Sequence, residues 1–110
     1  MHRIDEDMQE CIDSCLDCYA ICLSTAMGHC LETGGKHVAP DHFRLMMACA
    51  EICRTAAHFM LIGTPHHKHT CRECAEICRE CAKDCATFDG MQECVEACEE
   101  CAESCEKMAA

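Results

Sequence analysis

The sequence predicts an all-α protein: an antiparallel, up-down-up-down four-helix bundle with a cysteine-lined core, formed by residues 1–110 as one domain. Three clusters of helix-breaking residues divide the chain into four segments rich in the helix formers Ala, Glu, Met and Leu. Within these segments Cys recurs at intervals that alternate between three and four residues, which is typical of a helix face that points into a bundle. Short connections make consecutive helices antiparallel neighbours.

The breaks also predict where each helix starts and stops. Gly34 is suited to end the first helix, because glycine readily adopts the left-handed conformation found after a helix C-terminus. Thr64 followed by Pro65 predicts an N-cap and first turn for the third helix. Asp89 and Gln92 predict a capping box for the fourth. The first connection is the longest, and we expect it to be the most mobile. The predicted helices are 4–33, 41–62, 65–87 and 90–108.

The composition excludes a conventional aliphatic core. Leu, Ile, Val and Phe together make up 16 of 110 residues, and the net charge is -11, a combination typical of disordered chains. The 16 Cys and 8 Met can supply the missing apolar volume if they converge. The acidic balance predicts no nucleic-acid partner. The absence of a long apolar run predicts no membrane partner.

Cysteine forms one stripe on each of three helices. At about 100° per residue, Cys11, Cys15, Cys18 and Cys22 fall within about 60° of one another. The second helix carries only two cysteines, but His42, Met46, Ala56 and Met60 continue the same rhythm. The thiols therefore occupy the face where Leu and Ile ordinarily lie. They are Cys11, Cys15, Cys18 and Cys22; Cys49 and Cys53; Cys71, Cys74, Cys78, Cys81 and Cys85; and Cys94, Cys98, Cys101 and Cys105.

Simple packing and disulfide bonding are the two alternatives to metal binding. A lone buried Cys is ordinarily part of the core, but 13 on three stripes leave a thin core where folding alone would favour Leu. Residues three or four apart in a helix rarely have the geometry of a disulfide. Bridges between stripes are geometrically possible, so a disulfide-stapled helical scaffold stays open as an alternative.

Among metals, the stripes favour Cu(I). Zinc needs separate tetrahedral sets of four Cys or His, and iron–sulfur clusters need four ligands around one pocket. A continuous row of thiols suits a soft ion that accepts two or three bridging sulfurs, which Cu(I) does. If each Cu⁺ replaces one thiol proton, the core stays near neutral, and a full core holds roughly one copper per thiol. Many ions in a closed core indicate storage. A zinc or other soft-metal buffering protein remains the alternative.

The same residues argue against catalysis and for a reducing compartment. No Ser-His-Asp set, single activated Cys or inward Glu-x-x-His motif stands out, so no enzyme is predicted. The segment from Met1 to Cys11 is polar and acidic, without an export signal. Cytosolic thiols are kept reduced, which favours metal binding over disulfides. We therefore expect a cytoplasmic protein.

In these stripes the chain resembles the four-helix-bundle copper storage proteins, a Cys-rich family marked by a repeated CxxxCxxC pattern, and in particular its cytosolic bacterial branch. The resemblance extends over nearly the whole chain. It implies Cu(I) storage inside the bundle, assembly as a homotetramer, and copper entry at one end lined by His and Met. Members of this branch often carry several His between the third and fourth helices, whereas here residues 86–91 include none.

The topology places a candidate entry site at one end of the bundle. The end of the first helix, the start of the second and the third connection bring together His29, Cys30, His42, Met46 and Met91, all but Cys30 near the centres of the helix seams. We predict that these five residues join the stripes as copper ligands. The opposite end gathers Met8, Met60, His67 and Met108. The remaining histidines are predicted to lie on the surface: His2, His37, His58, His66 and His69. For His2, His37 and His66, a second metal site at the ends of the bundle stays open as an alternative.

Overall fold

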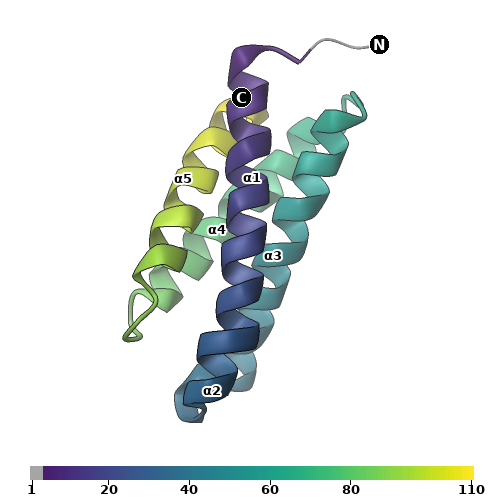
Figure 1. Cartoon of the computed structure of the whole chain (residues 1–110). Coiled ribbons are helices and arrows are strands. Elements are labelled where there is room, and N and C mark those ends of the chain that lie inside the picture. The colour runs from purple at the N-terminus through teal and green to yellow at the C-terminus, as the bar shows by residue number, and fades with distance from the viewer. Residues whose placement is uncertain (1–3) are drawn as a thin grey trace.

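The computed structural model describes residues 4–110, which form the predicted four-helix bundle (Figure 1). The first rod runs without a break through three consecutive elements, because the residues that join them keep right-handed helical backbone angles. A short 3₁₀ turn then leads to three further helices. The elements are α1 (Glu6–Thr25), the π-helix η1 (Ala26–Cys30), α2 (Leu31–Thr33), the 3₁₀ turn η2 (Gly35–Val38), α3 (Pro40–Leu61), α4 (His67–Cys85) and α5 (Gln92–Ala109).

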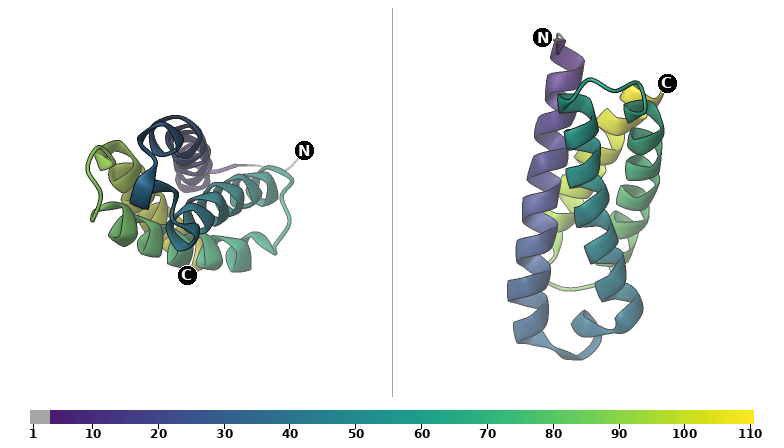
Figure 2. Two further views of the ribbon diagram at one scale, coloured as in Figure 1. Left: turned by 90° about the horizontal axis from the view of Figure 1, so that it is seen from below. Right: turned by 90° about the vertical axis from the view of Figure 1, so that its right-hand side faces the viewer.

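The four rods are arranged as a square. Helix α1 packs against α3 and α5, and α4 packs against the same two helices. The bundle measures 47 × 21 × 20 Å. The first rod and α3 extend past the turn that joins α4 and α5, so the connection containing η2 lies at the far tip of the molecule (Figure 2).

No helix within residues 4–110 combines the length and hydropathy of a membrane span. That residues 1–110 form a single domain stays a prediction.

Sulfur and small side chains fill the core. All sixteen cysteines are buried, and Ala residues flank them on α3, α4 and α5. Among the largest fully buried side chains are Ile12, Met46, Met60 and Met91. The thin core that the composition predicts is therefore real, and the stripes of Cys define its axis.

The helix boundaries differ from the predictions by a few residues for local reasons. Asp5 caps α1, and its Oδ1 accepts a hydrogen bond of 2.8 Å from the Met8 amide. Thr64 accepts a hydrogen bond from the His66 amide, as a cap would, but α4 begins only at His67. The capping box predicted at Asp89 is wrong: α5 begins at Gln92 without a side-chain cap.

The π-helix changes the direction of Cys30. The Leu31 amide donates to the carbonyl of Ala26, five residues back, and so widens the turn. In a regular α-helix Cys30 would be rotated by about 80° from Cys22, eight residues earlier. A wider turn reduces this rotation, and Cys30 is fully buried. The prediction that Cys30 lies away from the seam is therefore wrong, because the sequence pattern assumes a regular helix.

The first connection buries a histidine. Its η2 turn follows Gly34, whose φ of 69° requires glycine-like backbone freedom. His37, within η2, is only 6% exposed. The predicted surface position of His37 is wrong, because the turn folds back over the end of the bundle. The mobility of this connection stays a prediction.

A test of this end of the fold is Gly90→Ala in the turn between α4 and α5. Gly90 has a φ of 77°, and a Cβ there would lie 2.8 Å from Nε2 of His29. We expect a loss of about 1–2 kcal/mol in the free energy of unfolding of the reduced, metal-free protein, measured with urea. The control is Gly28→Ala, where a Cβ would meet nothing within 4 Å. An equal loss in both variants would contradict the backbone argument.

Candidate metal centre

Fifteen of the sixteen cysteines form a connected column along the bundle axis, which we call the thiol column; Cys30 lies apart from it. All the thiols are free and buried. The shortest contact joins the sulfurs of Cys22 and Cys94 at 3.3 Å. A disulfide bond is about 2.05 Å long, so these are thiol contacts. Two sulfurs that bind one ion through bonds of about 2.3 Å lie at most about 4.6 Å apart, and the sulfur contacts of 3.3 to 3.9 Å along the column meet this condition.

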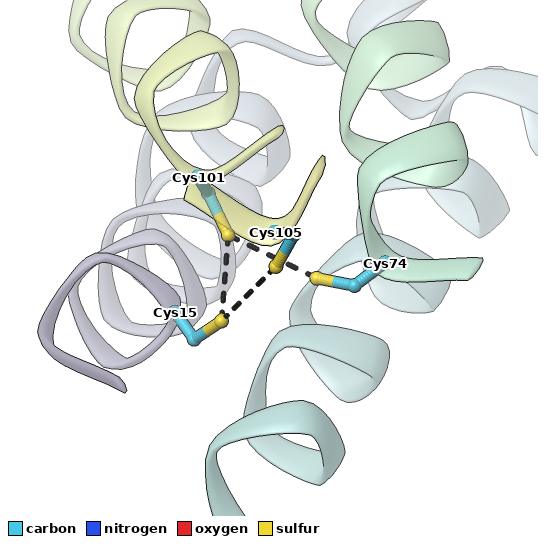
Figure 3. A group of neighbouring side chains, drawn as sticks. All are labelled: Cys15, Cys74, Cys101 and Cys105. Carbon is cyan, nitrogen blue, oxygen red and sulfur yellow. Dashed lines mark hydrogen bonds between the residues drawn. The ribbon is translucent and has the colours of Figure 1, made fainter. Parts of the chain in front are cut away.

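The contacts run both within and between helices. Thiols four residues apart touch along one helix, as Cys74 and Cys78 do at 3.9 Å. Across helices, Cys15 of α1 lies 3.6 Å from Cys101 and 3.5 Å from Cys105, both on α5 (Figure 3). Cys74 of α4 approaches the same group, 3.8 Å from Cys101. Three helices therefore supply sulfurs to one small volume.

Groups of thiols that could hold a metal ion overlap along the column. In each group the sulfurs all lie within 4.8 Å of one another. Cys18, Cys53 and Cys74 each belong to two groups, so the groups cannot all be filled as independent sites. The groups are Cys15/Cys74/Cys101/Cys105, Cys18/Cys49/Cys53/Cys78, Cys18/Cys22/Cys49/Cys98, Cys53/Cys74/Cys78/Cys101 and Cys11/Cys71/Cys105, among others.

Burial favours protonated thiols in the metal-free column. The pKa of the Cys22 thiol is raised by its hydrogen bond to Cys18 and by other thiols around it, and also by burial. The pKa of Cys30 is raised mainly by burial and in addition by the proximity of Cys94. A buried thiolate without a counter-charge is disfavoured, so an ion that binds here must displace protons.

Cys30 forms a separate sulfur site at one end of the column. Its Sγ lies 3.8 Å from Nε2 of His42, 3.8 Å from Sδ of Met46 and 3.9 Å from Sδ of Met91. All four residues are at most 4% exposed. We call this group (Cys30, His42, Met46 and Met91) the mouth. It combines thiolate, thioether and imidazole, three ligand types that suit copper.

Asp84 orients the imidazole of the mouth. Nδ1 of His42 lies 2.5 Å from Oδ2 of Asp84. When the neutral ring donates from Nδ1 to this carboxylate, the lone pair of Nε2 faces Cys30. Phe88 stacks on the same ring, with 4.1 Å between ring centroids. Neither Asp84 nor Phe88 is among the site residues that the sequence predicts. Asp84 lies three residues after Cys81, in the last turn of α4, and this spacing could have indicated that it is near the core.

Two further histidines lie outside the mouth. His29 is half-buried, and its Nε2 donates to the carbonyl oxygen of Asp89 at 3.3 Å. Its ring centroid is 5.1 Å from that of His37, which in turn is 6.4 Å from that of His42. Nδ1 of His37 is buried without a hydrogen-bond partner. Burial lowers the pKa of His37, and His29, His42 and Lys36 lower it further, which favours the neutral ring.

The opposite end of the bundle has a different character. Met60 is fully buried, and Met8 and Met108 pack against the core from its edge. His67 is half-buried and pairs with the Thr64 carbonyl at 2.9 Å. These residues close the end with apolar contacts. His58, His66 and His69 are exposed, as predicted, and His2 lies outside the described residues.

A helical bundle with a continuous thiol column and a sulfur- and imidazole-lined end defines a class of cysteine-rich metal-binding proteins. The model of the copper storage protein family, Csp, matches residues 4–110. The chain belongs to this family.

Relatives agree in fold and sequence. A crystal structure of the Nmul_A1745 protein from Nitrosospira multiformis is 58% identical, with a TM-score of 0.94 over 96% of both chains. The Cu(I)-bound copper storage protein BsCsp3 is 36% identical, with a TM-score of 0.87 over 96% of this chain and 100% of the other. Apo-Csp3 from Bacillus subtilis is 38% identical, with a TM-score of 0.83 over 93% and 98%.

A curated relative is also similar: the uncharacterized cysteine-rich protein YhjQ of Bacillus subtilis strain 168 is 36% identical over 86 residues, which is 78% of this chain and 79% of that protein. The chain is thus similar to both a metal-free and a Cu(I)-bound bundle.

Asp84→Ala tests the orientation of His42. The variant leaves a buried Nδ1–H without its acceptor, and we expect the free energy of unfolding of the metal-free protein to fall by about 1–2 kcal/mol in urea. Asp84→Asn is the matched control, because its side-chain carbonyl can still accept the hydrogen bond, and it should lose less. Equal stability of Asp84→Ala and the wild type would show that this pair does not hold the ring.

Proposed function

We propose that this protein stores Cu(I) in its thiol column, with each ion bound by two or three cysteine sulfurs and each sulfur shared between ions. The observation that carries the proposal is the overlap of the thiol groups. Sharing is what a connected cluster of a soft, low-coordinate ion requires. The family to which the chain belongs is that of the copper storage proteins.

The net charge of the buried thiol column determines how many copper ions it can hold. Each Cu⁺ that replaces a thiol proton leaves the buried column neutral, whereas a divalent ion held by four thiolates adds net negative charge to the core. Neutral loading implies roughly one copper per thiol. The column therefore has no net charge to compensate at any stage of filling.

Zinc buffering is the second candidate, and the four-thiol groups are the observation in its favour. A structural zinc site is a closed tetrahedral set of four ligands. Cys18 and Cys74 each belong to two of the groups, so filling one group removes a ligand from the next. Zinc would therefore saturate at about one ion per four thiols, far below the capacity expected for copper.

We infer that copper enters through the mouth and that its four residues, together with His29, are copper ligands in addition to the column. The support is the convergence of Met46, Met91 and His42 on Cys30, and the apolar closure of the opposite end. We further infer that the protein resides in a reducing compartment, the cytoplasm, because sixteen free thiols require one. Storage involves no turnover, so we assign the chain no catalytic activity.

The capacity is tested with the double variant Cys74→Ser/Cys78→Ser. We expect it to remain helical by circular dichroism and to bind about two copper ions fewer than wild type, since each lost thiol removes one neutral copper–thiolate pair. The measurement is an anaerobic Cu(I) titration of the fully reduced protein against a competing chelator. Proton release should be close to one per copper bound.

The matched control is Ala56→Ser/Ala102→Ser, which places two hydroxyl groups at fully buried positions and leaves every thiol intact. Its copper capacity should equal that of the wild type. Wild-type uptake of more than about ten ions supports storage, whereas saturation at about four or fewer contradicts it and favours zinc-type sites.

We also propose that the protein assembles as a homotetramer. Leu16 and Met27, 41% and 46% exposed, are eleven residues apart on the first rod and thus project from nearly the same face. We expect sedimentation to give a particle of four 12.2 kDa chains. Leu16→Glu/Met27→Glu should dissociate it, and Ser24→Glu, on another face of α1, should not. A monomeric wild type would contradict the proposal.

A further inference from the structure

The η2 turn carries a histidine that neither the thiol column nor the mouth uses. His37 is 6% exposed, yet its Nδ1 has no hydrogen-bond partner. Buried polar atoms are normally satisfied, so an orphaned nitrogen requires an explanation. The ring packs on Phe88 at 4.9 Å between centroids, a contact that an apolar side chain could make equally well. Packing alone therefore does not explain why an imidazole occupies this position.

The surroundings of His37 point to a metal ion. The centroid of the His37 ring lies 5.1 Å from that of His29 and 6.4 Å from that of His42. His29 is half-buried, whereas His42 is 4% exposed and touches Cys30. The three rings thus form a series from the edge of the molecule to the first thiol. The series lies against the turn between α4 and α5, because the His37 ring packs on Phe88 and the His29 ring contacts Asp89 and Gly90.

The hydrogen bonds of the outer rings leave lone pairs available. Nε2 of His29 faces the carbonyl oxygen of Asp89, which can only accept, so Nε2 carries the proton and Nδ1 is the free acceptor. Gly90 makes this arrangement possible, because a Cβ there would collide with the His29 ring. Nδ1 of His37 has no competing partner. Imidazole is a suitable copper ligand.

We propose that His37 and His29 together bind Cu(I) outside the thiol column and hold the ion before it passes to His42 and Cys30. This inference rests on the proposed storage function. The two imidazoles bind the ion through nitrogen lone pairs. When the ion moves inward, the copper–nitrogen bonds break and a copper–sulfur bond forms at Cys30. The Cys30 thiol releases its proton to solvent, so one proton leaves for each Cu⁺ that enters, and the two outer rings are again free.

The test compares His37→Leu with His37→Met. The two side chains are similar in volume, but only the thioether binds Cu(I). Loading is followed as reduced, metal-free protein takes copper from the Cu(I)–bicinchoninate complex. We expect His37→Leu to load about tenfold more slowly than wild type, and His37→Met to recover to within about twofold. The final copper capacity should stay within about one ion of wild type for both, because every ligand of the thiol column is retained. The control is His58→Leu, at an exposed position on α3, which should load at the wild-type rate.

The outcomes distinguish a failure of the proposed storage function from a failure of the proposed role of His37. Wild-type protein that binds few copper ions overturns storage itself. Normal capacity with wild-type loading in His37→Leu overturns only the role of His37, and equal slowing in the Leu and Met variants shows a packing role, which also overturns it.

A second measurement does not depend on the variants. In wild-type protein labelled with ¹⁵N at histidine and loaded with copper only in its thiol column, one further equivalent of Cu(I) should shift the Nδ1 resonances of His29 and His37. The resonances of His58 should not move. Unchanged His37 resonances would overturn the proposal.

Discussion

The structure depends on the packing of sulfur against sulfur along the bundle axis. A thiol is smaller than the aliphatic side chains that usually fill such a core, and it tolerates close contact with other thiols. Cys22 of α1 meets Cys94 and Cys98 of α5 at 3.3 and 3.5 Å, and similar contacts recur along the whole column. The buried Ala residues beside the thiols have small side chains, which lets the helices pack closely around the column. The outer faces then carry the acidic side chains that give the chain its charge of -11.

That packing also decides which chemistry the core can support. Buried thiols stay protonated because an isolated thiolate would have no counter-charge. A monovalent soft ion can replace each proton with no change in net charge. The same overlap of thiol groups that excludes independent zinc sites permits bridging by copper. Stability of the bundle and capacity for metal therefore have one origin, the continuous contact of small neutral sulfur groups.

The backbone is irregular at the mouth end of the bundle, whereas the middle of the bundle consists of regular α-helices. Backbone irregularities occur in and beside the mouth. A π-helical turn directs Cys30 into it, and next to it a 3₁₀ turn buries His37 and a glycine makes room for His29. π-Helical turns recur at functional sites in other proteins, where the altered register re-aims a side chain. Here the regular helices form a uniform store, and the irregular turns build the ligands through which the ion is proposed to pass.

The sequence by itself determined the fold class, the four helical segments and the inward direction of the fifteen column thiols, because periodicity is a local property that needs no knowledge of neighbours. Cys74 and Cys101 could be placed on inward faces from spacing alone. The position of Cys30 could not, since the spacing argument assumes a regular helix and the π-helical turn breaks that register. The burial of His37 and the pairing of His42 with Asp84, 42 residues away, arise from contacts between distant segments. Such contacts depend on the length of each rod and on how its end folds over its neighbours, which only the tertiary structure decided.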